Sequence, residues 1–260
     1  MLAFLRKKNG WDMILTVCMS PCTDVTIELD ALNVGKTNVV KNKTVTFGGK
    51  ALNVAIGVAR LGLDVFTTGL LYEENAQLFE NALQNEGVAF RFTKNKGRAR
   101  ENYKFIDNRS MLTEVNDVGA KVEERKLDEV LSSVHELSSK CDAVVFSGGL
   151  PKGVDPGFYG RLCTVVDPKC LKIIDASGER LRSALRLGAD LIKPNLEELE
   201  NTIGRQIQSK EDMLAACYEL ISCGAKRVLL SLGEEGAVLT DGMRNYHCKS
   251  TLWWTWSKYF

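Results

Sequence analysis

The chain of 260 residues is poor in histidine, in net charge and in long apolar runs. Only His135 and His247 occur, and no two cysteines have the Cys-x-x-Cys spacing, so a zinc site is not expected. The 34 basic and 33 acidic residues leave a net charge of +1, which provides no general attraction to nucleic acid or to an anionic membrane. No segment approaches the roughly 18 apolar residues of a membrane span. We therefore expect neither a nucleic-acid partner nor a membrane partner.

Cysteine is the residue type that is unexpectedly frequent. Several cysteines lie in apolar runs, such as Cys18 in MILTVCM and Cys217 in MLAACYELI. Free cysteines are often buried, and disulfides are rare in a reducing cytosol. We therefore expect a cytoplasmic protein with free, buried thiols. The eight cysteines are Cys18, Cys22, Cys141, Cys163, Cys170, Cys217, Cys223 and Cys248.

The first twelve residues, MLAFLRKKNGWD, place a short apolar patch before a basic cluster. A secretory signal has the opposite order and a longer apolar stretch. We interpret residues 1–12 as a loose extension that precedes an alternative start at Met13.

Strand and helix patterns alternate along most of the chain. MILTVCM (13–19) is an apolar run typical of a buried strand, and GGKALNVAIGVARLG (48–62) has helical spacing. From residue 123 onward, helical segments of about 10 to 15 residues are separated by short apolar strands. This alternation predicts an α/β fold with a doubly wound, mostly parallel sheet and helices on both of its faces.

Residues 25–47 and 98–116 have a different pattern, in which apolar and polar residues alternate. Such a pattern predicts exposed antiparallel strands, the second pair with its turn near Asp107 and Asn108. These strands do not fit inside the parallel sheet, so we expect them to form a small antiparallel β lid over one edge.

FGGKALNVA (47–55) is the first segment whose sequence could form a ligand-binding site. Its two glycines let the backbone approach a ligand, and the helix that follows directs its free amides toward them. A hydroxyl-rich or phosphorylated substrate would suit this site, although a plain strand-to-helix turn explains the segment equally well. The segment is neither a G-x-G-x-x-G fingerprint nor a Walker P-loop. A nicotinamide-dependent oxidoreductase is therefore disfavoured.

GRARENYK (97–104) is the second such segment. Side chains two residues apart share a face of a strand. A phosphate clamp would use three cations on one such face, whereas the alternative is a solvated basic edge strand. The residues on this face are Arg98, Arg100, Asn102 and Lys104.

SGGLPKG (147–153) and IIDASGE (173–179) each end a predicted strand in small residues, where open α/β sheets bind their ligands. In LIKPNLEELE (191–200), the Asn195 and Glu198 spacing fits a helix capping box, and it also allows both side chains to order metal-bound water and phosphate. SLGEEGAV (231–238) suits close backbone contact with a nucleotide, or a tight hairpin.

The order of these segments is more informative than any one of them. TVCMSPCTD, FGGKALNVA, GRARENYK, VVFSGGLPKGV, DASGE, LIKPNLEELE and LLSLGEEGAVL follow one another as in the ribokinase-like (PfkB) carbohydrate kinases. The chain most resembles the 1-phosphofructokinase and tagatose-6-phosphate kinase branch, over roughly residues 13–248. The resemblance implies a ribokinase-like domain over 13–249 that phosphorylates a sugar phosphate with ATP and Mg²⁺. It also implies a possible homodimer through the lid.

The resemblance further implies a role for each matching residue. The substrate would be fructose 1-phosphate, converted to fructose 1,6-bisphosphate, or alternatively tagatose 6-phosphate. Sugar contacts are expected from Asp24, Gly49, Lys50 and Asn53. The phosphate of the substrate is expected to bind Arg98, Arg100 and Lys104. ATP is expected to bind Lys193, Asn195, Ser231, Gly233 and Gly236, and the metal to bind Glu198. Mild departures are Ser20 and Cys22, where an asparagine and an apolar residue are usual, and Ala51, where glycine is usual.

The large departure is at residues 250–260, STLWWTWSKYF. The family carries there a Thr-x-Gly-Ala-Gly-Asp stretch, whose glycines form an anion hole and whose aspartate is the general base. No Gly, Asp or Glu follows residue 242 in this sequence, so we assign no catalytic residue. We interpret the tail as a truncation or reading-frame slip, with a binding surface made of tryptophans as the alternative. An inactive chain that only binds sugar phosphate is then a competing hypothesis.

Overall fold

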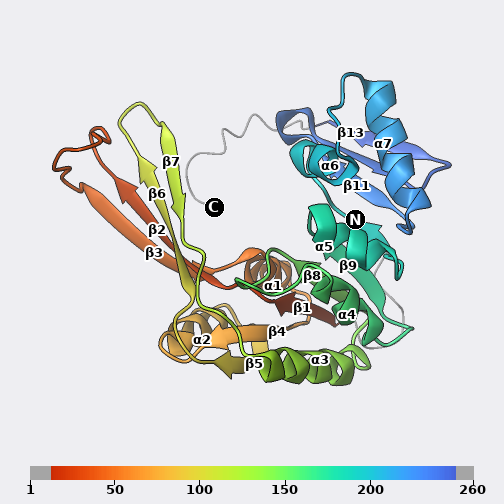
Figure 1. Cartoon of the computed structure of the whole chain (residues 1–260), viewed down its shortest axis with the longest axis horizontal. Coiled ribbons are helices and arrows are strands. Elements are labelled where there is room, and N and C mark those ends of the chain that lie inside the picture. The colour runs from red at the N-terminus through yellow and green to blue at the C-terminus, as the bar shows by residue number, and fades with distance from the viewer. Residues whose placement is uncertain (1–12, 250–260) are drawn as a thin grey trace. The chain divides into compact units, whose positions relative to one another are not determined.

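The structure is a computed structural model that describes residues 13–249. The expected extension at 1–12 and the aromatic tail at 250–260 lie outside the described residues. The chain divides into two compact units (Figure 1). Unit 1 runs to Asp155 and also includes Val165–Cys170, whereas unit 2 comprises Pro156–Thr164 and the chain from Leu171 onward.

The sheet of unit 1 has four parallel strands in the order β8-β1-β4-β5. Every residue of β1 and β8 is buried, as is typical of parallel strands that are covered on both faces. Gly69 of β4 has a φ of 123°, and a Cβ there would lie 2.0 Å from the Cys18 carbonyl oxygen. Only glycine therefore allows β1 and β4 to pair at this point. The strands are β1 (Ile14–Cys18), β4 (Val65–Tyr72), β5 (Ala89–Asn95) and β8 (Ala143–Ser147).

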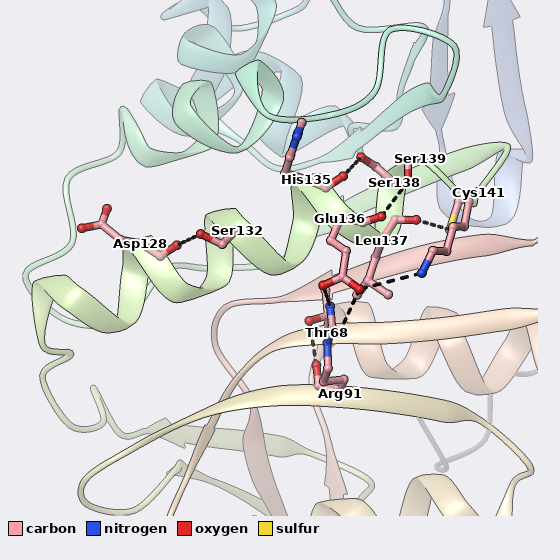
Figure 2. A network of polar contacts seen from close by, with 11 residues as sticks. Thr68, Arg91, Asp128, Ser132, His135, Glu136, Leu137, Ser138, Ser139 and Cys141 are labelled. Atoms are coloured by element: carbon pink, nitrogen blue, oxygen red, sulfur yellow. Dashed lines mark hydrogen bonds and ion pairs between the residues drawn. The ribbon is translucent and has the colours of Figure 1, made fainter.

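Three helices pack against this sheet, namely α1 (Lys50–Arg60), α2 (Ala76–Asn85) and α3 (Glu124–Ser138). Helix α1 buries Ala51, Leu52, Ala55 and Val58, which recur with the spacing of one helical face. Polar contacts join α3 to β5 in Figure 2: the guanidinium of Arg91 donates hydrogen bonds of 3.2 and 2.8 Å to the Glu136 carboxylate. This pairing lowers the pKa of Glu136. The pair links the exposed side of α3 to the edge strand of unit 1.

A second sheet of four strands forms the lid of unit 1, in the order β3-β2-β6-β7 (Figure 1). The outer pairs are antiparallel, as expected, but β2 and β6 pair in parallel. One face carries a polar row across the strands, of Thr46, Asp24, Asn102 and Asn116, and the other face an apolar row, of Val45, Val25, Tyr103 and Val115. The strands are β2 (Cys22–Glu28), β3 (Asn42–Gly48), β6 (Arg100–Ile106) and β7 (Leu112–Asn116).

Unit 2 continues the alternation of helices and strands. Strands β9, β10 and β11 are parallel neighbours, and β12 and β13 extend the sheet as an antiparallel hairpin. The elements are α4 (Phe158–Thr164), β9 (Leu171–Asp175), α5 (Gly178–Leu185), β10 (Leu191–Ile192), α6 (Leu196–Ile203), α7 (Lys210–Ser222), β11 (Val228–Ser231), β12 (Ala237–Thr240) and β13 (Asn245–Cys248).

The α/β prediction is confirmed, with a mostly parallel sheet and a small, mostly antiparallel second sheet. Strand β5 was not predicted, and β10 is shorter than the expected LIKPN strand. All eight cysteines are free, but Cys223 and Cys248 are exposed rather than buried. Over residues 13–249, no helix has both the length and the apolar character of a membrane span.

Candidate active site

Three backbone segments of unit 1 meet at the carboxyl ends of β1 and β8. Gly49, which precedes α1, has a φ of 137°, and a Cβ there would lie 3.2 Å from the Ser20 carbonyl oxygen. A Cβ at Gly148 would lie 3.3 Å from Lys50 Cβ, and one at Gly149 would lie 3.8 Å from Ser20 Cβ. The glycines therefore bring the β1 end, the β8 end and the start of α1 together, at the sheet edge where α/β proteins bind ligands.

The N-terminus of α1 could bind a ligand. No side chain caps this helix at Gly49, so its first amides and its dipole favour a negative or hydroxyl-rich group. The exposed Asn53 lies one turn into the helix, and its Oδ1 would be 2.8 Å from a Cβ at Gly48. The FGGKALNVA segment thus has the geometry that its sequence predicted, with Gly49, Lys50 and Asn53 around one helix start.

A hydrogen-bonded network runs along the polar face of the lid to this point. The Nε of Arg100 donates to Ser20 Oγ at 3.1 Å, and its Nη1 donates to Asn102 Oδ1 at 2.7 Å. Asn102 Nδ2 donates to Asp24 Oδ1 at 3.3 Å, and Lys104 Nζ lies 3.6 Å from the same oxygen. Lys104 thus lies beside the Asp24 carboxylate, whereas Arg100 is held by two neutral groups, a hydroxyl and an amide, which suits it to an anionic substrate.

Arg98 lies outside this network. It precedes β6, and its Nε bonds Glu101 Oε1 at 3.3 Å. Glu101 belongs to the opposite face of β6, where it also accepts a hydrogen bond from Tyr103. The structure therefore brings together Arg100 and Lys104 but gives Arg98 a different partner.

Cys22 lies beside the same carboxylate, since its Sγ donates to Asp24 Oδ2 at 3.4 Å. Burial, with a further contribution from Asp24, raises the pKa of the Cys22 thiol to about 12. Burial also raises the pKa of Cys18, at the end of β1, to about 12. Both groups are therefore protonated at neutral pH, and Cys22 acts as a donor to Asp24 rather than as a nucleophile.

The thiols give a first test of this placement. At about pH 8 we expect iodoacetamide to alkylate Cys223 and Cys248 rapidly and Cys22 far more slowly, because only the thiolate reacts. Since the Cys22 pKa is raised, its thiolate fraction grows only as the pH approaches 12. Peptide mass spectrometry over a time course measures this order. Denatured protein is the control, in which all cysteines should react alike, and rapid labelling of native Cys22 would contradict the structure.

In unit 2, Asn195 and Glu198 form the capping box of α6. Asn195 Oδ1 accepts a hydrogen bond of 2.7 Å from the Glu198 amide, and Glu198 Oε2 accepts one of 3.1 Å from the Asn195 amide. The structural interpretation of this spacing is therefore correct, and it orients both side chains at the helix start. Lys193, just before them, has its Nζ 3.2 Å from Oδ1 of Asp175, which is only 8% exposed. The sequence predicted that IIDASGE ends a strand at the ligand-binding edge, but it gave Asp175 itself no role.

The two glycines in the turn after β11, Gly233 and Gly236, have different surroundings. Gly236 has a φ of 95°, and a Cβ there would lie 1.9 Å from the Cys248 carbonyl oxygen, so packing against β13 requires glycine. Gly233 has a φ of 58°, and within the described part of the chain nothing lies within 4 Å of a Cβ placed there. The Ser231 amide is fixed by a 3.0 Å hydrogen bond to the Pro194 carbonyl. Gly233 is therefore the glycine of this turn that has open space beside its backbone.

A pocket of about 670 Å³ adjoins this turn in unit 2. Asn195, Ser231 and Gly233 line it, which are three of the five expected nucleotide-binding residues, whereas Lys193 and Gly236 do not. Its volume is in the range of small-ligand sites. An apolar wall beside a polar turn suits a flat heterocycle that carries phosphates. The apolar lining includes Leu196, Ile207, Met213, Leu214, Val238 and Tyr246.

Comparison with known proteins agrees with this geometry. Residues 17–252 match the family model described as pfkB family carbohydrate kinase. The chain belongs to that family. It is 31% identical over 237 residues to 1-phosphofructokinase of Escherichia coli K12, which covers 91% of this chain and 76% of that protein. It is 30% identical over 238 residues to tagatose-6-phosphate kinase of Staphylococcus epidermidis, which covers 90% of this chain and 76% of that protein.

Solved structures of pfkB family kinases have the same fold. Phosphofructokinase-2 of Escherichia coli, solved with fructose-6-phosphate, superposes with a TM-score of 0.84 at 26% identity. The superposition covers 92% of this chain and 80% of that one. The structure of a tetrameric inhibited form of the same enzyme matches with a TM-score of 0.85. Sugar-phosphate kinases are thus the relatives of this chain in both sequence and structure.

A kinase of this family takes its phosphoryl group from ATP with a divalent metal. Over residues 13–249, no three side chains of the His, Cys, Asp and Glu type gather closely enough to hold a metal by themselves. Mg²⁺ rarely needs such a cage, because it is usually held by one or two carboxylates together with water and substrate phosphates. The carboxylates of Glu198 and Asp175 fit that requirement in donor type.

Proposed function

We propose that this chain is a sugar-phosphate kinase of the cytoplasm, with fructose 1-phosphate as its substrate and with one kinase domain over residues 13–249. The observation that carries the proposal is the network of Ser20, Arg100, Asn102, Asp24 and Lys104 on the polar face of the lid. A sugar that already bears a phosphate needs cations beside the hydroxyl-binding groups, and this network supplies both.

The candidate residues of unit 1 would then bind different parts of the substrate. Arg100 and Lys104 bind the substrate phosphate, while the Asp24 carboxylate accepts hydrogen bonds from sugar hydroxyls. Gly49 and the first turn of α1 receive the sugar, and Lys50 and Asn53 donate to its oxygens. Asp24 has two oxygens, and its contacts with Asn102 and Cys22 hold both in place before substrate arrives.

In unit 2 the pocket beside Ser231 and Gly233 would hold ATP. Lys193 and Asn195 follow β10 and would contact the ATP phosphates, with Glu198 ordering Mg²⁺ through water. When bound, the metal neutralises the charge that develops on the transferred group. The protein contributes mainly position and electrostatic stabilisation, as is usual for phosphoryl transfer.

Calorimetry tests the proposal through binding. Fructose 1-phosphate is titrated into the full chain, with neutral fructose and inorganic phosphate as matched ligands. We expect fructose 1-phosphate to bind more tightly than either, since it alone engages both the cations and Asp24. Equal affinity for fructose and fructose 1-phosphate would show that the lid cations do not bind the substrate phosphate, and would overturn the proposal.

Measurements on the same protein distinguish two alternative functions. The similarity to tagatose-6-phosphate kinase makes tagatose 6-phosphate a second candidate substrate, so it is titrated in parallel. A chain that binds sugar phosphate without turnover is the other, because residues 250–260 depart from the Thr-x-Gly-Ala-Gly-Asp stretch of the resembled family. A coupled assay for ADP release, run at high enzyme concentration, distinguishes binding from turnover.

We also propose that the apolar face of the lid forms a homodimer. Val45 and Val115, at the two ends of the apolar row of the lid, are 42% and 55% exposed, whereas Val25 within the row is buried. Exposed apolar rows of this kind mark interaction surfaces. We expect Val115→Glu to shift a dimer to a monomer in analytical ultracentrifugation, because the new carboxylates would be buried. Val34→Glu, in an exposed loop, is the matched control, and a monomeric unmodified chain would contradict the proposal.

A further inference from the structure

Ser20 is a residue that the binding roles above leave without an assigned purpose. It follows β1, and its hydroxyl accepts a hydrogen bond of 3.1 Å from the Nε of Arg100, 80 residues later in the chain. A side chain of the β1 end thereby reaches a cation of the lid. Where the resembled family usually has asparagine, this chain has serine, so the contact is a feature of this sequence.

The guanidinium of Arg100 is held at two of its three nitrogens. Nε is bound by Ser20 and Nη1 by Asn102 Oδ1, at 2.7 Å. Within residues 13–249, Nη2 has no protein acceptor. Because the guanidinium is planar, two anchored nitrogens fix the direction of the third. Nη2, which carries two N–H groups, is therefore the nitrogen best placed to donate to an anionic ligand.

The backbone of Ser20 makes this anchor rigid. Its carbonyl oxygen lies 3.2 Å from the position of a Cβ at Gly49, and its Cβ lies 3.8 Å from that of a Cβ at Gly149. Pro21, the next residue, is buried and has a fixed φ. Ser20 therefore has little freedom to follow Arg100, and Arg100 must adopt the position that Ser20 sets.

We propose that Ser20 is a positioning residue that aims Arg100 at the phosphate of the substrate and so sets the preference for a phosphorylated over a neutral sugar. The inference rests on the proposed function of the lid cations. In this proposal, the Ser20 hydroxyl affects the affinity for fructose 1-phosphate but not the affinity for neutral fructose. A residue that merely supported the fold would affect both affinities.

The experiment compares dissociation constants for fructose 1-phosphate and for neutral fructose. Ser20→Ala should weaken fructose 1-phosphate binding by roughly tenfold, the usual worth of one hydrogen bond near a charged group. Fructose binding should stay unchanged. Ser20→Thr, which keeps the hydroxyl, should restore the phosphate preference, and Ser132→Ala on the exposed face of α3 is the matched control.

A double-mutant cycle shows whether Ser20 acts through Arg100. In an Arg100→Ala background, Ser20→Ala should change the fructose 1-phosphate affinity by less than about twofold, since the residue it positions is gone. An undiminished tenfold loss in that background would overturn the inference, as would equal losses for fructose and fructose 1-phosphate. In either case the unmodified chain would still bind fructose 1-phosphate, and the proposed function would stand. No binding by the unmodified chain would overturn both.

Discussion

A polypeptide of these 260 residues is expected to phosphorylate fructose 1-phosphate at least about 10⁴-fold more slowly than a chimera that carries a family-type C-terminal segment. In the chimera, residues 250–260 are replaced by the corresponding segment of the Escherichia coli 1-phosphofructokinase relative. The resemblance implies that this segment supplies a general base and an anion hole. Loss of a base costs about 10² to 10⁴ in rate, and loss of an anion hole a further 10² to 10³.

The two proteins should differ in turnover but not in sugar binding. The groups that we propose to bind the substrate lie in unit 1, which the exchange leaves unaltered, so calorimetry with fructose 1-phosphate should give similar dissociation constants. ADP release measures turnover, and a chimera with the new aspartate changed to asparagine is the control. Equal turnover by the 260-residue polypeptide and the chimera would show that another group serves as the base. An inactive chimera that still binds the sugar would show that other positions limit the reaction.

Replacing Arg100 with alanine is expected to weaken fructose 1-phosphate binding by about 100-fold, because hydrogen bonds to charged groups contribute about 1.5 to 3 kcal/mol each. Arg100 is held at Nε and Nη1, so its Nη2 donor is already oriented before the ligand arrives. Arg98→Ala should change the affinity less than about threefold, since Arg98 pairs with Glu101 and surface pairs contribute little.

Comparing the fructose 1-phosphate affinities of the Arg98→Ala and Arg100→Ala variants decides between the sequence-based prediction and the structure. Spacing alone placed Arg98 and Arg100 on one face, whereas the structure separates them. Calorimetry on both variants measures the difference, and Arg100→Lys should be intermediate, because it keeps the charge but not the planar fork. Equal losses at the two positions would return Arg98 to the phosphate site and contradict the network described for β6.

Periodicity was sufficient to predict the fold because most elements are long and their buried faces regular. Helix α1 follows directly from the spacing of Leu52, Ala55 and Ala59, and β1 from an unbroken apolar run. Strand β5 was missed because AFRFTKN mixes aromatic and basic residues, and it lies at the edge of the unit 1 sheet, where one side of the strand has no neighbour. The parallel pairing of β2 with β6 was missed because register between distant segments leaves no local pattern.

The candidate site was predictable where a period or a motif defines direction. Alternation placed Arg100, Asn102 and Lys104 on one face, and this is the face they share. It failed at Arg98 because the strand begins only at Arg100, so the two-residue period does not extend that far. Gly236 illustrates a different limit, since its need for glycine comes from the backbone of Cys248, which is distant in sequence.

The parallel pairing of β2 and β6 has a consequence for how the protein is made. Asp24 and Asn102 are neighbours across that pair although 78 positions separate them, so the polar face of the lid cannot assemble as a local hairpin. Such distant pairing is slow, because the entropy of closing the loop is lost before any contact compensates for it. The ribosome must release β4, α2 and β5 before the polar face of the lid can form. The lid strands are nevertheless complete at Asn116, before any of unit 2 has been translated.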